Sequence, residues 1–146
     1  MKFRFLTLAA CLAGTSLIAV SSGQAQGPAS YMYTMMLNIV GPPANSIWEI
    51  AGADRLTEQD WARAKQMVGR LSQTAPAISV GGTSIDEIER AKSPEWKNWA
   101  GKFMDAVSAA AQAVERGDRM RLVTASETLV EACEGCHTAF PPLAPR

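Results

Sequence analysis

Apolar side chains recur every three to four positions along most of the chain, and this spacing is typical of the buried face of an α-helix. No segment alternates between apolar and polar residues over the length of a strand. We therefore predict an all-α fold.

The first helical stretch covers residues 30–40, and Gly41-Pro42-Pro43 interrupts it. Because proline is tolerated in the first turn of a helix, a second piece begins near Pro43 and ends near Gly52. The pattern predicts either one kinked helix or two short ones. The residues predicted to face inward from the first stretch are Met32, Met35, Met36 and Ile39.

The second helix is expected to begin after Thr57, which caps it together with Asp60, and to end near Ala75-Pro76. Residues 76–93 then form a surface crossover that contains a short capped turn. The carboxylates of this crossover are predicted to lie in solvent: Asp86, Glu87 and Glu89.

The third helix starts at Ser93-Pro94 and ends at Gly117, and Asp118 caps the fourth. Four amphipathic helices with short loops and one longer crossover match an antiparallel four-helix bundle. The inner stripe of the fourth helix is predicted to hold Leu122, Ala125, Leu129, Ala132 and Cys136.

The N-terminus predicts export. Lys2 and Arg4 precede an apolar run over residues 5–20, and a short polar stretch follows up to Ala25. This order is typical of a secretory signal peptide. We expect residues 1–25 to be removed and the protein to be periplasmic.

Cleavage after Ala25 leaves a mature domain of residues 26–146, in which Cys133 and Cys136 are the remaining cysteines. Cysteines of exported proteins are usually oxidised or otherwise occupied, so this pair needs an explanation. Cys11 offers a lipoprotein cleavage site as an alternative, but the apolar run before it is short and continues beyond it.

Composition narrows the choice of partners. The 146 residues carry 14 basic and 14 acidic side chains without any basic cluster, so the sequence predicts no binding of nucleic acid. Beyond residue 20, no apolar run approaches the roughly 20 residues that cross a bilayer, so we expect no membrane span in the mature chain.

The two mature cysteines belong to the pentapeptide Cys133-Glu134-Gly135-Cys136-His137, which has the C-x-x-C-H pattern of covalent haem attachment. Two thiols in so short a segment can add across the two vinyl groups of one haem, and the adjacent histidine can bind its iron. Glycine at position 135 would let the porphyrin approach the backbone. We expect one covalent haem c, held by Cys133, Cys136 and His137.

Other interpretations of the motif are weaker. A thioredoxin-like redox pair would begin a helix after a strand, and a structural zinc site would need four ligands. A local disulfide would leave the neighbouring His137, the only histidine of the chain, unexplained. With one histidine, the second axial position of the iron is filled by methionine, is vacant, or holds an uncommon ligand such as lysine.

An export signal, four helices and a C-x-x-C-H motif on the last helix, followed by the aromatic Phe140, resemble the class II c-type cytochromes, the cytochrome c′ and cytochrome c-556 group. The resemblance covers about residues 30–140. It implies a left-handed bundle with the haem between the first and last helices, the two cysteines as thioether links and His137 as proximal ligand. The chain differs from that group at Gly41-Pro42-Pro43 and in having no arginine between residues 27 and 54.

In such a bundle, the distal residue comes from the first helical stretch. The helical pattern of the c-556 type brings Met36 nearest to its ligating methionine, with Met32 and Met35 as neighbours and a vacant site as the main rival. Methionine is more often a core filler than a ligand. We predict Met36 as the distal ligand of a six-coordinate iron. The tryptophans are expected mainly to fill the core: Trp48, Trp61, Trp96 and Trp99.

Two functions are compatible with these features. The first is a periplasmic electron carrier that exchanges electrons with other redox proteins in transient encounters. The second is binding or sensing of a diatomic gas such as NO or CO, which needs an open distal pocket. Peroxidase chemistry would want a distal acid–base group such as a second histidine, so we expect no enzymatic activity. A monomer and a homodimer are both compatible with the sequence.

Overall fold

The computed structural model describes residues 31–142, and no strand occurs among them, so the predicted all-α fold is confirmed. The predicted signal peptide and its cleavage site lie outside the described residues. The elements are α1 (Tyr31–Met35), the π-helix η1 (Met36–Val40), α2 (Gly41–Gly52), α3 (Glu58–Ser79), α4 (Ile85–Lys92), α5 (Pro94–Arg116) and α6 (Arg119–Ala139).

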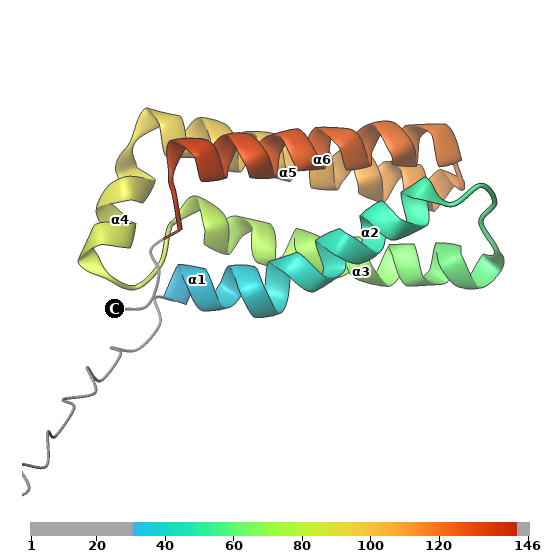
Figure 1. Cartoon of the computed structure of the whole chain (residues 1–146), viewed down its shortest axis with the longest axis horizontal. Helices are drawn as coiled ribbons and strands as arrows, with labels where there is room; N and C mark the ends of the chain where they lie inside the picture. The colour runs from blue at the N-terminus through green and yellow to red at the C-terminus, as the bar shows by residue number, and fades with distance from the viewer. Residues whose placement is uncertain (1–30, 143–146) are drawn as a thin grey trace, which may run out of the picture.

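The long helices lie lengthwise beside one another (Figure 1). α5 packs along α6 and α3, and α2 packs against α3 and α6. The short helix α4 crosses the end of the molecule at which α1 begins and α6 ends (Figure 1). The start of α1 and the end of α6, far apart in the sequence, therefore lie at the same end of the molecule as α4.

α1, η1 and α2 form one helical path with a π turn in its middle. A proline ring clashes with the carbonyl four residues back in a regular helix, and proline lacks the amide hydrogen that would bond to it. At this point the Gly41 N–H donates instead to the carbonyl of Met36, five residues back. Gly41-Pro42-Pro43 therefore widens the helix rather than ending it, which agrees with one of the two predicted alternatives, a single irregular helix, and not with two separate short ones.

The π turn shifts the inward face of the chain by one residue. Met35 and Val40, five positions apart, are buried, whereas Ile39 is 47% exposed. The prediction that Ile39 faces inward was wrong because it carried the 3.6-residue repeat through the wider turn. After the turn, regular spacing resumes with Ala44, Ile47 and Ala51.

α3 continues through Pro76 to Ser79, so the predicted end near Ala75-Pro76 was wrong. Ile78 in the added turn is buried, and the indole N–H of Trp96 donates a 2.9 Å hydrogen bond to its carbonyl. These tertiary contacts offset the missing amide hydrogen of Pro76. The extension brings Ile78 to the end of the molecule that α4 covers.

The other helix ends agree with the caps expected from the sequence. Thr57 and Asp60 form a reciprocal capping box, and the side chains of Ser93 and Asp118 cap α5 and α6. Gly117 adopts a left-handed conformation with φ 63° and ends α5. The predicted inner stripe of α6 is buried from Leu122 to Ala132, while Cys136 is half-buried.

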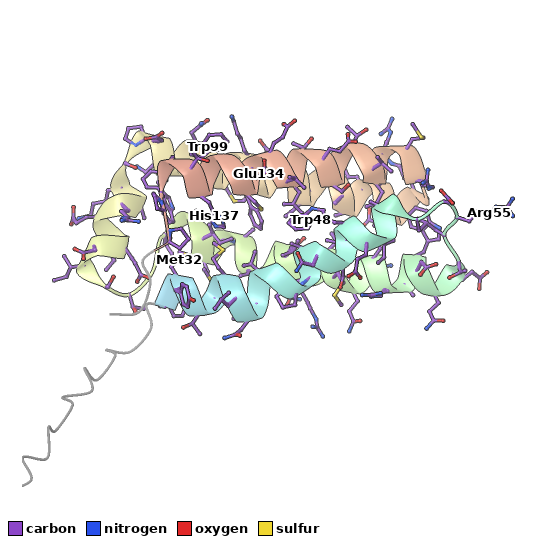
Figure 2. All side chains as sticks on the ribbon, in the orientation of Figure 1. Met32, Trp48, Arg55, Trp99, Glu134 and His137 are labelled. Carbon is purple, nitrogen blue, oxygen red and sulfur yellow. The ribbon has the colours of Figure 1, made fainter. Side chains whose placement is uncertain are left out.

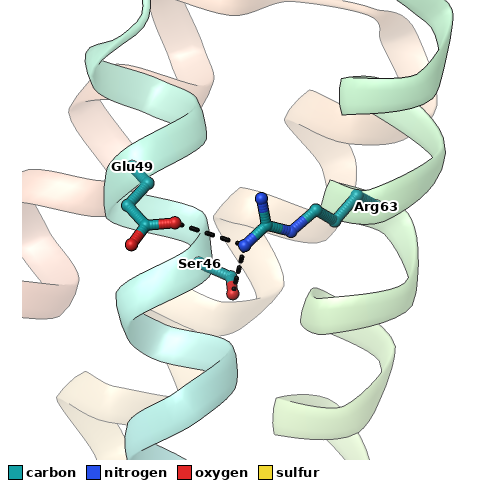
Figure 3. A network of polar contacts seen from close by, with 3 residues as sticks. All are labelled: Ser46, Glu49 and Arg63. Carbon is teal, nitrogen blue, oxygen red and sulfur yellow. Dashed lines mark hydrogen bonds and ion pairs between the residues drawn. The ribbon is translucent and has the colours of Figure 1, made fainter.

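A small polar network joins the outer sides of α2 and α3 (Figure 3). The Arg63 guanidinium donates to the Ser46 hydroxyl at 3.0 Å and to the Glu49 carboxylate at 3.2 Å. Since both charged side chains are at least half exposed, the ion pair contributes little to stability.

Candidate functional site

The C-x-x-C-H motif occupies the last turns of α6, and the side chain of His137 extends from there toward the first helical path (Figure 2). Cys133, Cys136 and His137 line a single cavity of 610 Å³, here called the motif cavity. Its other walls come from α2, α3, α5 and η1. They include Met36, Gly41, Trp48, Ile78, Trp99 and Phe103.

A second cavity of 230 Å³, here called the end cavity, lies where α4 closes the molecule. α4 contributes Glu87 and Arg90, and α1 contributes Met32. Phe140 closes another side and packs edge-to-face on Trp96, with the ring centroids 5.1 Å apart. The two cavities share four lining residues, Met36, Ile78, Cys136 and His137.

His137 therefore adjoins both cavities, and so does Met36 from the opposite helical path. Met32 lines the end cavity alone. Met35 is only 2% exposed and lines neither cavity, because its side chain is packed inside the core. Among the three methionines of the first stretch, Met36 is thus the one that shares both spaces with the histidine.

Both motif cysteines are free thiols. Burial, reinforced by the neighbouring Cys136 and Glu134, raises the pKa of the Cys133 thiol to about 11, and burial also raises the pKa of Cys136. Reactive dithiols have the opposite shift, because a redox or nucleophilic cysteine must form a thiolate near neutral pH. The pair is therefore protonated at pH 7 and does not have the character of a thioredoxin-like centre.

The tryptophans divide into two groups. Trp96 is buried in the core, as predicted, and Trp61 packs against the core. Trp48 and Trp99 line the motif cavity. The Trp99 indole fills the space that a Cβ at Gly135 would occupy, so the glycine is needed for this packing. Closer approach of a porphyrin at Gly135 stays a prediction.

The prediction that Glu87 lies in solvent was wrong, since this side chain is only 3% exposed. Asp86 and Glu89 of the same helix are exposed, as predicted. Glu87 is buried because its carboxylate accepts backbone hydrogen bonds from the start of α4 and from Met32 of α1. Its place three residues after Ser84 signals a capping box, but nothing in the sequence marks the contact with α1.

The residues of the motif cavity fit a c-type haem. Cys133 and Cys136 supply two neutral thiols on one side of the cavity, His137 supplies an imidazole, and most of the remaining wall is apolar. The indole N–H of Trp48 is buried and finds no hydrogen-bond partner among the described residues. A buried donor without a partner is costly, so it suits a group that carries an acceptor, such as a haem propionate.

Comparison with protein-family models, curated proteins and solved structures finds no match to this chain. Among residues 31–142, no three His, Cys, Asp or Glu side chains gather closely enough to hold a metal ion by themselves. None of the helices in that part of the chain has the length and apolar character of a membrane span. The two cavities are therefore the features of residues 31–142 that point to a function.

Proposed function

We propose that the protein is an exported c-type haem protein that carries single electrons between other periplasmic redox proteins. The observation that supports this proposal is the convergence of Cys133, Cys136 and His137 on one largely apolar cavity, opposite Met36. We further propose that the helices form the antiparallel four-helix bundle of the class II c-type cytochromes. The tight reversal between α5 and α6 at Gly117 and Asp118 is compatible with that topology.

The thiols of Cys133 and Cys136 are proposed to add across the two haem vinyl groups, each sulfur bonding to one carbon and its hydrogen going to the other. Their raised pKa keeps both as S–H until that reaction. His137 and Met36 would be the two side chains that hold the haem iron. When bound, the haem supplies an iron that accepts and releases one electron.

His137 itself is exposed, and the apolar side chains on the other side of this centre are proposed to limit the access of water to it. Phe103, Ile78 and Trp99 wall the motif cavity, and a dry surrounding limits the reorganisation of water when the charge of the iron changes. Electron exchange then needs only a brief encounter with a partner, for which a small interface is sufficient.

A second candidate is binding of a diatomic gas. The end cavity favours it, because this space adjoins both Met36 and His137 and is mostly apolar. If Met36 does not bind the iron, a small molecule has room to do so. The optical spectrum of the reduced protein with and without carbon monoxide separates the candidates, since a six-coordinate carrier resists the gas.

The covalent haem is tested by expressing the full chain with a cytochrome maturation system. We expect a red periplasmic protein whose haem stays with the polypeptide in a denaturing gel, and loss of that signal in a Cys133→Ser, Cys136→Ser double variant. Trp61→Phe, outside both cavities, is the control and keeps its haem. A colourless protein with a Cys133–Cys136 disulfide would contradict the proposal.

A further inference from the structure

Glu87 is an unusual residue in this structure because it is a carboxylate buried beneath a short surface helix. It is 3% exposed, while Asp86 and Glu89 on the same helix are exposed. Removing an ionised carboxylate from water is costly unless hydrogen bonds replace the lost hydration. The hydrogen-bond donors to its two oxygens therefore indicate which parts of the structure the buried carboxylate stabilises.

One oxygen completes the start of α4. Glu87 Oε2 accepts the backbone N–H of Thr83 at 2.9 Å and that of Ser84 at 3.0 Å, and the Ser84 hydroxyl accepts the N–H of Glu87 in return. This is a capping box, which needs only one carboxylate oxygen and is usually formed at the surface. Local capping does not explain why the side chain is buried.

The other oxygen reaches across the molecule. Glu87 Oε1 accepts the backbone N–H of Met32 at 2.9 Å, from a residue 55 positions earlier in the chain. The N–H groups in the first turn of a helix have no partner within the helix, so the carboxylate satisfies a donor that α1 itself leaves open. The bond ties the beginning of the first helical path to α4.

The preceding loop is shaped to hold the carboxylate in this place. Gly81 has a φ of 80°, and a Cβ there would lie 2.7 Å from the Cβ of Ala91 and 2.8 Å from the carbonyl oxygen of Glu87. A Cβ at Gly82 would collide with the Glu87 carboxylate itself. Two consecutive glycines are therefore required for the loop to pack around the side chain.

Glu87 also lies in the wall of the end cavity, together with Met32, Met36 and His137. The residue that it ties down, Met32, is one helical turn before Met36. The bond therefore joins the first turn of the path to α4, at the end of the molecule where α6 ends.

We propose that Glu87 is a positioning residue that holds the first helical path against the cavities and so controls which ligand reaches the iron opposite His137. With the Met32 bond formed, Met36 stays at the cavity wall. Without it, the first turn of α1 around Met32 opens, and the end cavity beside Met36 becomes accessible to a small ligand from solvent. The inference rests on the proposed haem site and goes beyond it by naming the residue that regulates access to the side opposite His137.

Glu87→Gln is the central variant. A glutamine can keep its oxygen toward Thr83 and Ser84, but its amide nitrogen then faces the Met32 N–H, and two donors cannot bond. In the haem protein we expect carbon monoxide to bind the reduced form about tenfold faster, since a bond to a charged acceptor is lost. Hydrogen exchange of the amides in residues 31–36 is expected to accelerate by a similar factor, about tenfold.

Three further variants distinguish loss of the Glu87–Met32 hydrogen bond from a general loss of structure. Ser84→Ala removes a capping contact but leaves the bond to Met32, and it is expected to match the unsubstituted protein in both measurements. Met32→Pro removes the N–H while keeping Glu87, in a first turn where proline is tolerated, and is expected to reproduce Glu87→Gln. Met32→Ala loses the side chain but keeps the N–H, so it serves as the matched control for Met32→Pro.

The outcomes distinguish the two proposals. A Glu87→Gln protein that carries haem and has unchanged carbon monoxide kinetics and unchanged exchange in residues 31–36 would overturn the positioning role alone. Equal acceleration in Ser84→Ala would also overturn it, because capping would then explain the effect. A chain that attaches no haem would overturn the proposed function. Hydrogen exchange in residues 31–36 would still show whether the Glu87–Met32 hydrogen bond stabilises the start of α1.

Discussion

Met36 and Met35 are adjacent in the chain but have different surroundings. Met35 is enclosed by the core, where its flexible thioether fills space. Met36 is half-buried and lines both cavities. At the scale of the residue, this difference favours Met36 over Met35 as a ligand.

Met36→Ala in the oxidised haem protein is expected to abolish the near-infrared methionine-to-iron band and to convert the iron to a high-spin form. Loss of a thioether that favours reduced iron is also expected to lower the reduction potential. Met35→Leu, which conserves volume in the core, is the control and keeps the band. A high-spin spectrum in the unsubstituted protein would exclude Met36 as ligand and favour gas binding.

At the scale of the element, the π turn of η1 decides which side chains the first path presents to α6. Its formation depends on Gly41, where a Cβ would lie 3.0 Å from the carbonyl oxygen of Met36. That oxygen accepts the Gly41 N–H and cannot move away without breaking the wide turn. Glycine is therefore needed here for a close approach within a helix.

Gly41→Ala tests this interpretation through the sign of a stability change. Glycine to alanine inside a helix normally stabilises by about 0.5–1 kcal/mol, and we expect that gain for Gly69→Ala in α3, where a Cβ meets nothing within 4 Å. At Gly41 we expect a loss of about 1 kcal/mol instead, because the tight contact strains the turn. Urea unfolding of both variants measures the difference, and equal stabilisation would show that the turn relaxes freely.

At the scale of the whole molecule, a partly open cavity of 610 Å³ lies between helices that otherwise pack closely. The side chains that line it lose packing partners on the cavity side when nothing fills it. A covalently attached group that fills this space and binds His137 would stabilise the folded chain strongly, because binding energy of a cofactor is coupled to folding.

The Cys133→Ala, Cys136→Ala double variant is accordingly expected to lose haem and more than about 4 kcal/mol of unfolding free energy relative to the haem protein, the effect of a ligand at about 1,000 times its Kd. Urea unfolding followed by far-UV circular dichroism provides the measurement. Cys133→Ala alone keeps one attachment site and serves as an intermediate control. If the double variant were as stable as the haem protein, the cavity would not be a cofactor site.

Several features could be predicted because their signals lie within a few residues of one another. The caps at Thr57, Ser93 and Asp118 bond within their own first turns, and Gly117 ends α5 through its own backbone conformation. The C-x-x-C-H motif is equally local, so its position on one helix follows from the sequence alone. The haem, the export and the electron-carrier function stay predictions.

The sequence by itself determined the all-α class, most helix ends and the candidate attachment residues, since short-range periodicity and capping specify them. Tertiary structure alone decided that α3 runs through Pro76, that Ile39 faces outward and that Glu87 is buried against Met32. The physical reason is distance along the chain. Glu87 accepts a hydrogen bond from the backbone N–H of Met32, 55 positions earlier, and because every residue except proline has such an N–H, the local sequence around Glu87 does not reveal this partner.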